Sequence, residues 1–464
     1  MSPSPTTRTS TEPEDGRADT PDGADTDGTD TDGGDTDGGG SAGETDAGAP
    51  PSRSGLQIRP PRIATGVERS ATPLELFYDL AYVVVAGELA VSFVEHQTWH
   101  GLAVFAGLFT VLWSSWVSTT LYANRFDTDD AVFRLAQLLS TLAIAGCGAA
   151  ASDAVGSTAV QFAACFLLAR VVLVGLYLRA WRHVPQARST LTVYVATASV
   201  AAALWAVSLA VPAPGRYVLW AVGVAVEGLG PLLATRTRDV LPVHMAHLPE
   251  RFGLFVILVL GEVVTAVVTG VHDAHWARLP VAVAVAGFVL AGALWWSYFD
   301  VTSASSSAEL QEEDAQANDD RPDDDEDDGS GEDEGTDEDG EDDGATDERH
   351  DLFAYGHLPL TLGIITAGVG LEELVLHPAA GLPSAAGWLA AGGTALYLLG
   401  AALIVGGTHR RLGAAWPWPT AAVPLVLAVA LAGPPALVAV CLLAAVAVVV
   451  AVTGSKSRVS DQGR

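Results

Sequence analysis

Residues 72–80 read TPLELFYDL and open the first long apolar run of the chain, which continues through Glu88 to Val94. Residues 248–255 read LPERFGLF and open a second such run, which continues through Glu262 to Val271. Both runs begin with Pro and Glu, and each carries a further Glu, preceded by Gly, twelve or thirteen residues later. We interpret the two runs as matching helices of two related halves of the protein.

Of the 464 residues, 49% are hydrophobic, yet the formal net charge is −31. These two values describe different segments of the chain. Residues 1–66 and 303–350 are rich in Asp, Glu, Gly and Thr, so they cannot bury enough apolar surface to offset chain entropy and are predicted to be disordered. The remainder consists of apolar runs of about 18–25 residues, the length that crosses a bilayer core of about 30 Å. This pattern excludes a soluble globular protein and predicts an all-α, polytopic integral membrane protein.

The apolar runs predict about twelve transmembrane helices. The first helix has a well-defined start, because Thr72 can cap it, Pro73 suits its first position and Glu75 completes a capping box. The last two helices are separated only by Gly433-Pro434-Pro435. The predicted ranges are 73–94, 99–122, 131–151, 157–180, 190–211, 216–234, 250–271, 277–299, 352–376, 385–407, 416–432 and 435–453.

Matching motifs extend the internal similarity beyond the first and seventh helices. Residues 112–116 read LWSSW in the second helix, and residues 294–298 read LWWSY in the eighth. Six helices per half is an even number, which predicts parallel repeats related by an axis along the membrane normal. The predicted organisation is an acidic cytoplasmic tail (1–66), a first six-helix repeat (67–240), a second repeat (241–453) with the acidic insert 303–350, and a C-terminal tail (454–464).

Basic residues predict the orientation in the membrane. With the N-terminus inside, the cytoplasmic segments from Arg53 onward carry 19 Lys and Arg residues, whereas the outer loops carry only Arg216 and Arg278. This positive-inside bias predicts a multi-pass protein of the cell membrane with both termini in the cytoplasm. No apolar segment follows a basic patch at the N-terminus, so no cleavable signal peptide is expected.

Basic charge is carried by arginine, since Lys456 is the single lysine among 24 basic residues. A hydrated acidic surface suits a protein in molar salt, where electrostatic screening reaches only about 3 Å. We therefore expect a halophilic, archaeal source. An ordinary acidic tail is the alternative explanation.

Four charged residues lie deep within predicted helices. Glu88 and Glu262 are roughly 18–20 Å along their helices at 1.5 Å per residue. A charge at such depth costs about 2.5–3.5 kcal/mol on insertion scales, so it is usually functional. We hypothesise that Glu88, Glu262, Glu227 and Arg170 face the bundle interior and line one polar pathway, with Arg170 pairing one carboxylate. The alternative is that they are buried, hydrogen-bonded structural groups.

Glu75 and Asp79 are four residues apart and share a helix face, where like charges repel. The pair predicts a cation, a proton or an arginine between the carboxylates, and the candidate arginines are Arg69, Arg125 and Arg251. The capping box and the helix dipole also account for Glu75, and the dipole accounts in part for Glu250. We include all three acids in the candidate ion or substrate pathway.

Other residue patterns argue against catalysis and metal binding. His244, His247 and Glu250 lack a supporting metal-site motif, the three cysteines have no metal-ligand spacing, and no nucleophile elbow, phosphate loop or dinucleotide fingerprint occurs. The acids at the end of the ninth helix, Glu372 and Glu373, fit a solvated helix end, and the Gly-rich stretches 360–370 and 385–407 fit close helix packing. We expect no enzymatic activity, cofactor, metal or nucleic-acid partner; the expected partners are the lipid bilayer and a cation or proton.

Four motifs in order, at 73–80, 124–127, 250–262 and 296–300, resemble the low temperature requirement A (LtrA) membrane proteins. The resemblance covers about residues 66–453, and the acidic tail and insert depart from it. It implies a class of membrane protein named for a growth phenotype in the cold, and it implies no reaction. Two hypotheses remain open: a secondary transporter or ion pathway that uses the intramembrane glutamates, and a non-transporting protein of envelope integrity or stress response whose buried acids are structural. A third, weaker option is an intramembrane enzyme that acts on lipid.

Overall fold

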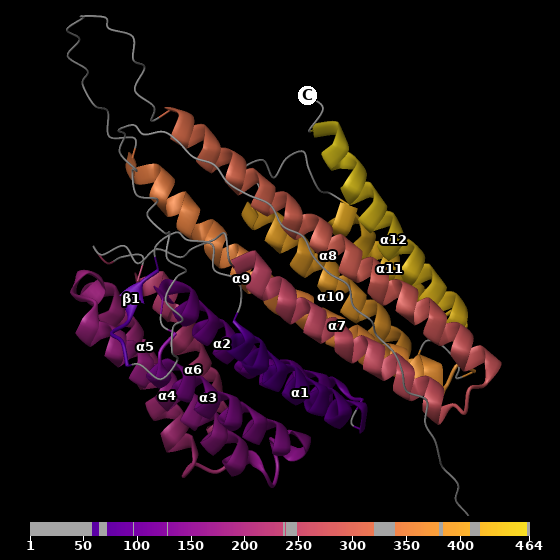
Figure 1. Cartoon of the computed structure of the whole chain (residues 1–464). Coiled ribbons are helices and arrows are strands. Elements are labelled where there is room, and N and C mark those ends of the chain that lie inside the picture. The colour runs from indigo at the N-terminus through magenta and orange to yellow at the C-terminus, as the bar shows by residue number, and fades with distance from the viewer. Residues whose placement is uncertain are drawn as a thin grey trace, which may run out of the picture. The chain divides into compact units, whose positions relative to one another are not determined.

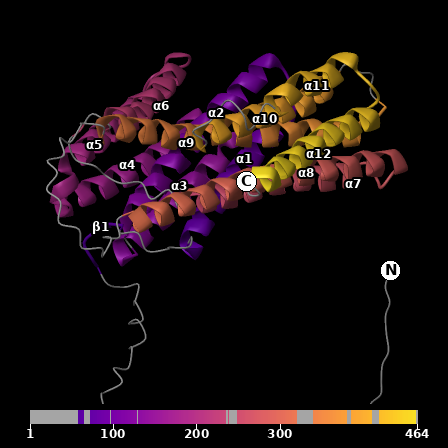
Figure 2. The same ribbon diagram turned by 90° about the horizontal axis from the view of Figure 1, so that it is seen from above.

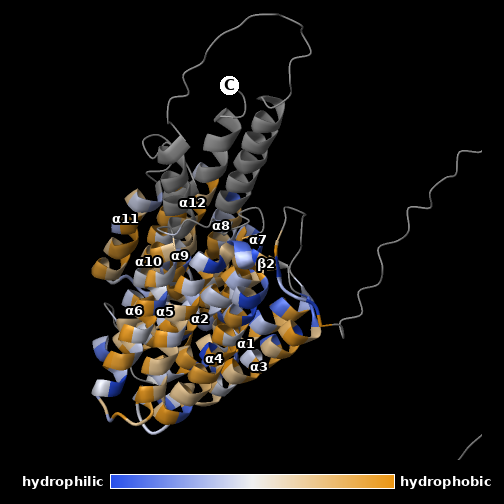
Figure 3. Ribbon diagram, turned by 90° about the vertical axis from the view of Figure 1, so that its left-hand side faces the viewer, coloured by the Kyte–Doolittle hydropathy of each residue, from blue (hydrophilic) through white to orange (hydrophobic). Residues whose placement is uncertain are grey.

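The computed structural model describes residues 58–64, 72–95, 97–127, 129–234, 237, 248–319, 339–379, 384–408 and 418–461, and these are almost entirely helical (Figure 1). Eleven of the described helices are long and apolar enough to cross a membrane, so the chain is an all-α, multi-pass integral membrane protein. Hydrophobic residues predominate on the helices in Figure 3. The helices are α1 (Pro73–Glu95), α2 (Trp99–Arg125), α3 (Ala131–Ala149), α4 (Ala159–His183), α5 (Arg188–Ser208), α6 (Gly215–Ala234), α7 (Leu248–Asp273), α8 (Arg278–Asp319), α9 (Asp339–Leu376), α10 (Ala385–Thr408), α11 (Trp418–Ala432) and α12 (Ala436–Asp461), with short 3-10 turns η1 (Ala151–Asp153) and η2 (Pro185–Ala187).

One predicted span is shorter than expected. The prediction placed a full transmembrane helix at 416–432, whereas α11 has 15 residues and carries Pro424 in its interior. At 1.5 Å per residue α11 is about 22 Å long, which is less than the roughly 30 Å of a bilayer core. The described part of the chain therefore holds eleven candidate spans and one shorter apolar helix.

Two helices continue into the acidic insert that was predicted to be disordered. α8 runs to Asp319 and α9 begins at Asp339, while 320–338 lies outside the described residues. A helix already nucleated by packing extends at low cost, and residues 308–318 are rich in Ala, Glu and Gln, which favour helix. The predicted disorder of the insert as a whole stays a prediction.

A small sheet that the sequence analysis did not predict ties the segment before α1 to the end of α2. β1 (Arg62–Ile63) pairs antiparallel with β2 (Phe126–Asp127), with Ile63 opposite Phe126. The N–H of Ala64 also donates to the carbonyl of Arg125 at 3.0 Å. Strands of two residues leave no alternating pattern in a sequence, which explains why they were missed.

Asp130 anchors this end of the first six helices. Its side chain caps α3 by accepting the N–H of Phe133 at 3.0 Å, and it also binds the guanidinium of Arg179 from α4 at 2.7 and 3.0 Å. Burial raises the pKa of Asp130, but the hydrogen bonds from Arg179, Phe133 and Arg59 outweigh it and hold that pKa below its usual value. Asp130 is therefore an ionised structural group that joins α3, α4 and the segment before β1.

The helices form two groups whose contacts meet along α1. Within the described chain α1 contacts α2 and α3, and α7 contacts α8 and α9. The two groups touch where α1 packs on α7 and α9 and where α2 packs on α9. Figure 2 shows the second group from above, with α12 alongside α8, in agreement with their contact. The α1–α7 contact joins the two acid-bearing helices that the sequence singled out.

Glycines place the backbones of α9 and α10 in direct contact. A Cβ atom added at Gly370 would lie 2.3 Å from the backbone nitrogen of Ala390, and one at Gly393 would lie 2.3 Å from that of Ala367. Gly363 and Gly400, seven residues from Gly370 and Gly393, approach the partner backbone in the same way. Only glycine fits such a seam, which agrees with the close helix packing expected for the Gly-rich stretches.

The seam predicts opposite outcomes for two adjacent substitutions. Gly393→Ala should destabilise the protein by about 1–3 kcal/mol, because its methyl group overpacks the seam. Gly392→Ala is the matched control, since no atom lies within 4 Å of its added Cβ. The control should be neutral or stabilising by up to about 1 kcal/mol, because alanine favours helix over glycine. SDS-induced unfolding in mixed micelles measures both, and equal effects of the two substitutions would contradict the seam.

Candidate functional site

Arg251 near the start of α7 bridges two carboxylates of α1. Its Nη1 lies 2.8 Å from Glu75 Oε2, and its Nη2 donates to Asp79 Oδ1 at 3.0 Å. All three residues are buried. An arginine from the other half of the chain therefore forms ion pairs with both members of the predicted acid pair. Of the three candidate arginines, Arg69 lies outside the described residues and Arg125 lies elsewhere.

Local sequence positions each member of this cluster. Thr72 and Glu75 form the predicted capping box, with the N–H of Thr72 donating to Glu75 Oε2 at 3.0 Å and the N–H of Glu75 to Thr72 Oγ1 at 3.3 Å. The capping role and the ion pair thus use the same carboxylate. Trp116 Nε1 donates to Asp79 Oδ1 at 2.8 Å, and its ring stacks on Phe255 with centroids 4.2 Å apart. Asp79 Oδ2 is buried and has no hydrogen-bond partner in the described part of the chain.

A chain of hydroxyl groups lies beside the acid cluster. Tyr78 donates to Thr119 Oγ1 at 3.0 Å, and the hydroxyls of Tyr78 and Tyr82 are 2.7 Å apart. Tyr82 is in turn 2.7 Å from Ser115 Oγ. Because each hydroxyl has one proton, the bond from Tyr78 to Thr119 requires Tyr82 to donate to Tyr78 and Ser115 to donate to Tyr82. The protons of this buried chain therefore all point in one direction.

Arg170 continues the chain from Ser115 to α6. Its Nη2 donates to Ser115 Oγ, and its Nη1 donates to Glu227 Oε1 at 2.5 Å. The side chain of Arg170 is 1% exposed and that of Glu227 is 9% exposed. The hypothesis that Arg170 pairs one intramembrane carboxylate therefore agrees with the structure, and its partner is Glu227. The resulting network joins α1, α2, α4 and α6.

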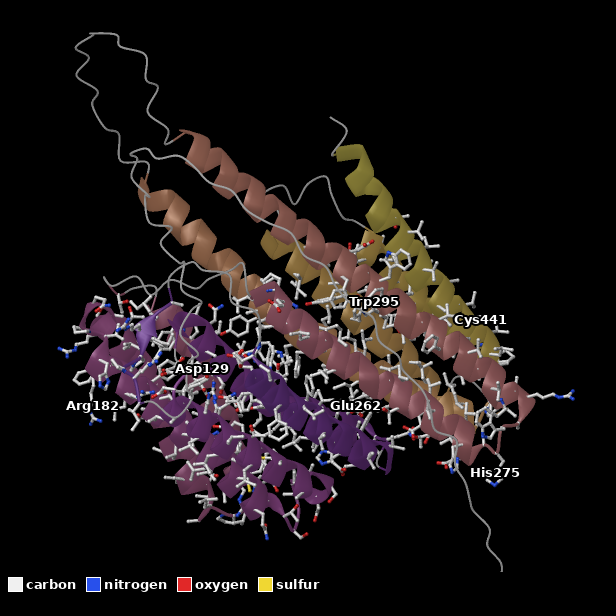
Figure 4. All side chains as sticks on the ribbon, in the orientation of Figure 1. Asp129, Arg182, Glu262, His275, Trp295 and Cys441 are labelled. Carbon is white, nitrogen blue, oxygen red and sulfur yellow. The ribbon has the colours of Figure 1, made fainter. Side chains whose placement is uncertain are left out.

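Glu262 lies at the contact between α7 and α1, as Figure 4 shows. A Cβ atom added at Gly87 would lie 2.8 Å from Glu262 Oε2, so the absence of a side chain at Gly87 makes room for the carboxylate. Glu88, the next residue on α1, is close enough to Glu262 for the two carboxylates to repel each other. Within the described part of the chain, neither glutamate forms an ion pair with a basic side chain.

Glu88 does not face the bundle interior, which corrects the sequence hypothesis. It is exposed on the same side of α1 as Phe77, Leu80 and Val84, where it borders a groove between α1 and α3. Since lipid-facing and core-facing sides of a membrane helix are both apolar, the sequence could not tell which side carried Glu88. Glu250 is likewise exposed, in the first turn of α7.

The structure therefore places six of the seven predicted site residues in three groups. Arg170 and Glu227 are paired, Glu75 and Asp79 share Arg251, and Glu262 lies near Glu88. Whether the groups form one pathway stays a prediction. No set of three or more His, Cys, Asp or Glu side chains in the described ranges could hold a metal ion, and His244 and His247 lie outside those ranges.

Sequence analysis missed the hydroxyl members of the network, although α1 carried a signal for them. Glu75, Tyr78, Asp79 and Tyr82 are spaced by three, one and three residues, which places them on one helix face. Four polar or amphipathic residues on one face of a membrane helix predict a buried polar contact with neighbouring helices. The partners Ser115, Thr119 and Trp116 carry no comparable signal, since serine, threonine and tryptophan are common in membrane helices.

The Arg251 cluster predicts a large loss of stability on substitution. Arg251→Met should cost about 3–5 kcal/mol, because it leaves Glu75 and Asp79 buried without their shared cation. Arg134→Met is the matched control; its partner Asp129 and Arg134 itself are 31% and 43% exposed, and such pairs contribute about 0–1 kcal/mol. Adding Glu75→Gln and Asp79→Asn to Arg251→Met should restore part of the loss. Equal unfolding midpoints for the two arginine variants would contradict the cluster's role.

Comparison with known proteins agrees with the resemblance in the motifs. The family model of the bacterial low temperature requirement A protein (LtrA) matches residues 70–319 and 332–454. An uncharacterized protein of Rhizobium meliloti (strain 1021) is 28% identical over 320 residues, covering 66% of this chain and 69% of the relative. No solved structure matches the chain significantly. The family match spans most of the sequence and includes every described transmembrane helix, so this chain is a member of the LtrA family.

Proposed function

We propose that this protein is a secondary transporter or ion pathway in which Glu88 and Glu262 hold a cation or a proton at the contact between the two halves. The observation that carries the proposal is the position of Glu262 against Gly87, beside Glu88, within membrane-spanning helices. Two neighbouring carboxylates in an apolar medium repel each other, and a shared proton or cation removes that repulsion. Such a site can take up and release its ion as its surroundings change.

A two-repeat arrangement is part of the proposal, because many transporters place their sites between repeats. Each helix contact within α1–α6 has a counterpart in α7–α12: for example, α2 contacts α4 and α6, while α8 contacts α10 and α12. Side-chain contacts support the same correspondence. Ser115 of the LWSSW motif receives Arg170 from α4, and Ser297 of the matching motif bonds to Tyr397 of α10 at 2.7 Å. The α8–α9 contact has no counterpart, so the second half is the more closely packed one.

A second candidate function is a non-transporting role in envelope integrity or stress response. The observation that favours it is that Glu75, Asp79 and Glu227 all pair with buried arginines, as structural acids do. Under this alternative the glutamates near Gly87 would also serve only packing. The two functions differ in whether Glu88 and Glu262 are needed for ion movement.

Ion flux in proteoliposomes tests the proposal. The full-length protein should dissipate a proton, sodium or potassium gradient faster than empty liposomes do. Glu88→Gln and Glu262→Gln should each reduce that flux to background, because the amide cannot bind the ion. The control Glu373→Gln alters an acid near the end of α9, where its partner His377 is 66% exposed, and should retain the flux. No flux of any of the three ions in the wild type, or full flux in both glutamine variants, would favour the structural role.

A glycine pair tests the geometry of the site independently of its charge. Gly87→Ala places a methyl group 2.8 Å from the Glu262 carboxylate and should displace it, so ion flux should fall. Gly261→Ala is the matched control, because nothing lies within 4 Å of its added Cβ, and its flux should match the wild type. Equal flux in the two alanine variants, at matched reconstitution, would show that the contact between Gly87 and Glu262 is not used.

A further inference from the structure

A pocket inside the first six helices carries polar groups that the proposed ion site does not use. It offers about 60 Å³ to the centres of water-sized molecules, which leaves room only for a small ligand. Its walls come from α2, α4, α5, α6 and the described part of α9. The charged and aromatic residues that line it are Arg125, Glu227, Trp113, Tyr177, Tyr194 and Tyr355.

Arg125 is a buried cation, and no carboxylate in the described part of the chain forms an ion pair with it. It is 6% exposed, and its guanidinium lies over the ring of Tyr194, 4.7 Å from the centroid. The guanidinium also hydrogen-bonds to the hydroxyls of Tyr177 and Tyr194, but neutral hydroxyls do not balance its charge. Its Nε and Nη1 have no hydrogen-bond partner, and no described carboxylate forms an ion pair with it. A buried charge left in this state is costly, so its presence points to a partner that is bound from outside.

A second unsatisfied donor lines the same pocket. The indole nitrogen of Trp113 is buried and has no hydrogen-bond partner among the described residues. Three of the pocket's hydroxyl groups are occupied, because Ser114, Ser118 and Thr197 donate to backbone carbonyls of their own helices at 2.8, 2.9 and 3.0 Å. The lining atoms that lack a hydrogen-bond partner in the described part of the chain are Arg125 Nε, Arg125 Nη1 and Trp113 Nε1. All three are donors, which calls for a ligand with acceptors.

The net charge of the pocket indicates whether its ligand is an anion or a cation. Glu227 also lines the pocket, but Arg170 compensates it through the ion pair at 2.5 Å. Arg125, Arg170 and Glu227 together therefore carry a net charge of +1. Carboxylates are planar acceptors that match a guanidinium fork in two hydrogen bonds. The aromatic side chains provide apolar walls for the body of the same ligand.

We propose that this pocket binds a small organic carboxylate with an apolar or aromatic body, held by Arg125 and received between the aromatic walls. Binding of this anion does not depend on the proposed ion pathway. Its further role as the transported substrate rests on that proposed function, and Glu227 would then link the pocket through Arg170 and Ser115 to α1.

Binding of radiolabelled benzoate to the full-length protein in nanodiscs tests the assignment. The wild type should bind benzoate saturably, and uncharged benzamide should not compete. Arg125→Met should weaken binding by about tenfold or more, because it removes a charge-assisted hydrogen bond. Arg216→Met is the matched control; Arg216 is partly buried at the start of α6, donates to the carbonyl of Ser208 and does not line the pocket. It should bind benzoate as the wild type does.

Thermal unfolding separates a ligand-binding arginine from a structural one. Without benzoate, Arg125→Met should unfold at the same temperature as the wild type or higher, because an unpaired buried charge is removed. A structural arginine would instead give a lower temperature. If the methionine variant does not fold, Arg125→Lys keeps the charge and loses the fork, so weaker benzoate binding in that variant supports the pocket.

Three results would overturn the assignment: no saturable benzoate binding to the wild type below about 10 mM, equal binding by wild type and Arg125→Met, or unchanged binding by Arg125→Lys where only that variant folds. Benzoate binding without ion flux would support the carboxylate pocket and contradict the proposed transport function. Ion flux that depends on Glu88 and Glu262, without benzoate binding, would support the ion pathway and rule out the carboxylate pocket.

Discussion

Arg251 forms buried ion pairs between the two halves of the chain. Arg251 of α7 satisfies Glu75 and Asp79 of α1, and Trp116 of α2 completes the binding of Asp79. Separating α1 from α7 would leave buried charges without partners, which is far more costly in an apolar medium than in water. The contact therefore fixes which faces of the two helices meet, and so it brings Glu262 against Gly87 further along the same pair of helices.

The buried acids differ in how they are neutralised, and this difference separates structure from function. Glu227 has its own arginine, and Glu75 and Asp79 share one, so these acids resemble structural ion pairs. Glu88 and Glu262 repel each other, and no arginine among the described residues forms an ion pair with either. The same reasoning applied to cations singles out Arg125, whose guanidinium meets aromatic rings and an open pocket. Both functional proposals rest on these residues, Glu88, Glu262 and Arg125, whose charges have no opposite charge paired with them in the described part of the chain.

The sequence predicted those features that depend on length and composition. Helix positions followed from the apolar runs, the capping box from Thr72 and Glu75, and the need for a cation from the spacing of Glu75 and Asp79. The direction in which Glu88 points could not be predicted, because lipid and protein core select the same apolar residues. The hydroxyl chain depends on three-dimensional neighbours such as Ser115 and Tyr82, which lie 33 residues apart. Helical extension into the acidic insert also depends on packing elsewhere, since local composition alone favoured disorder.

The glycine seam between α9 and α10 limits how this protein can change shape. Two backbones in direct contact at intervals of seven residues cannot slide past each other without steric overlap, and side-chain rotation offers no relief because glycine has no side chain to rotate. The two helices are therefore expected to move together as one rigid body. Any conformational change of the protein would have to leave their backbone contact intact and take place between other helices, where side chains separate the backbones.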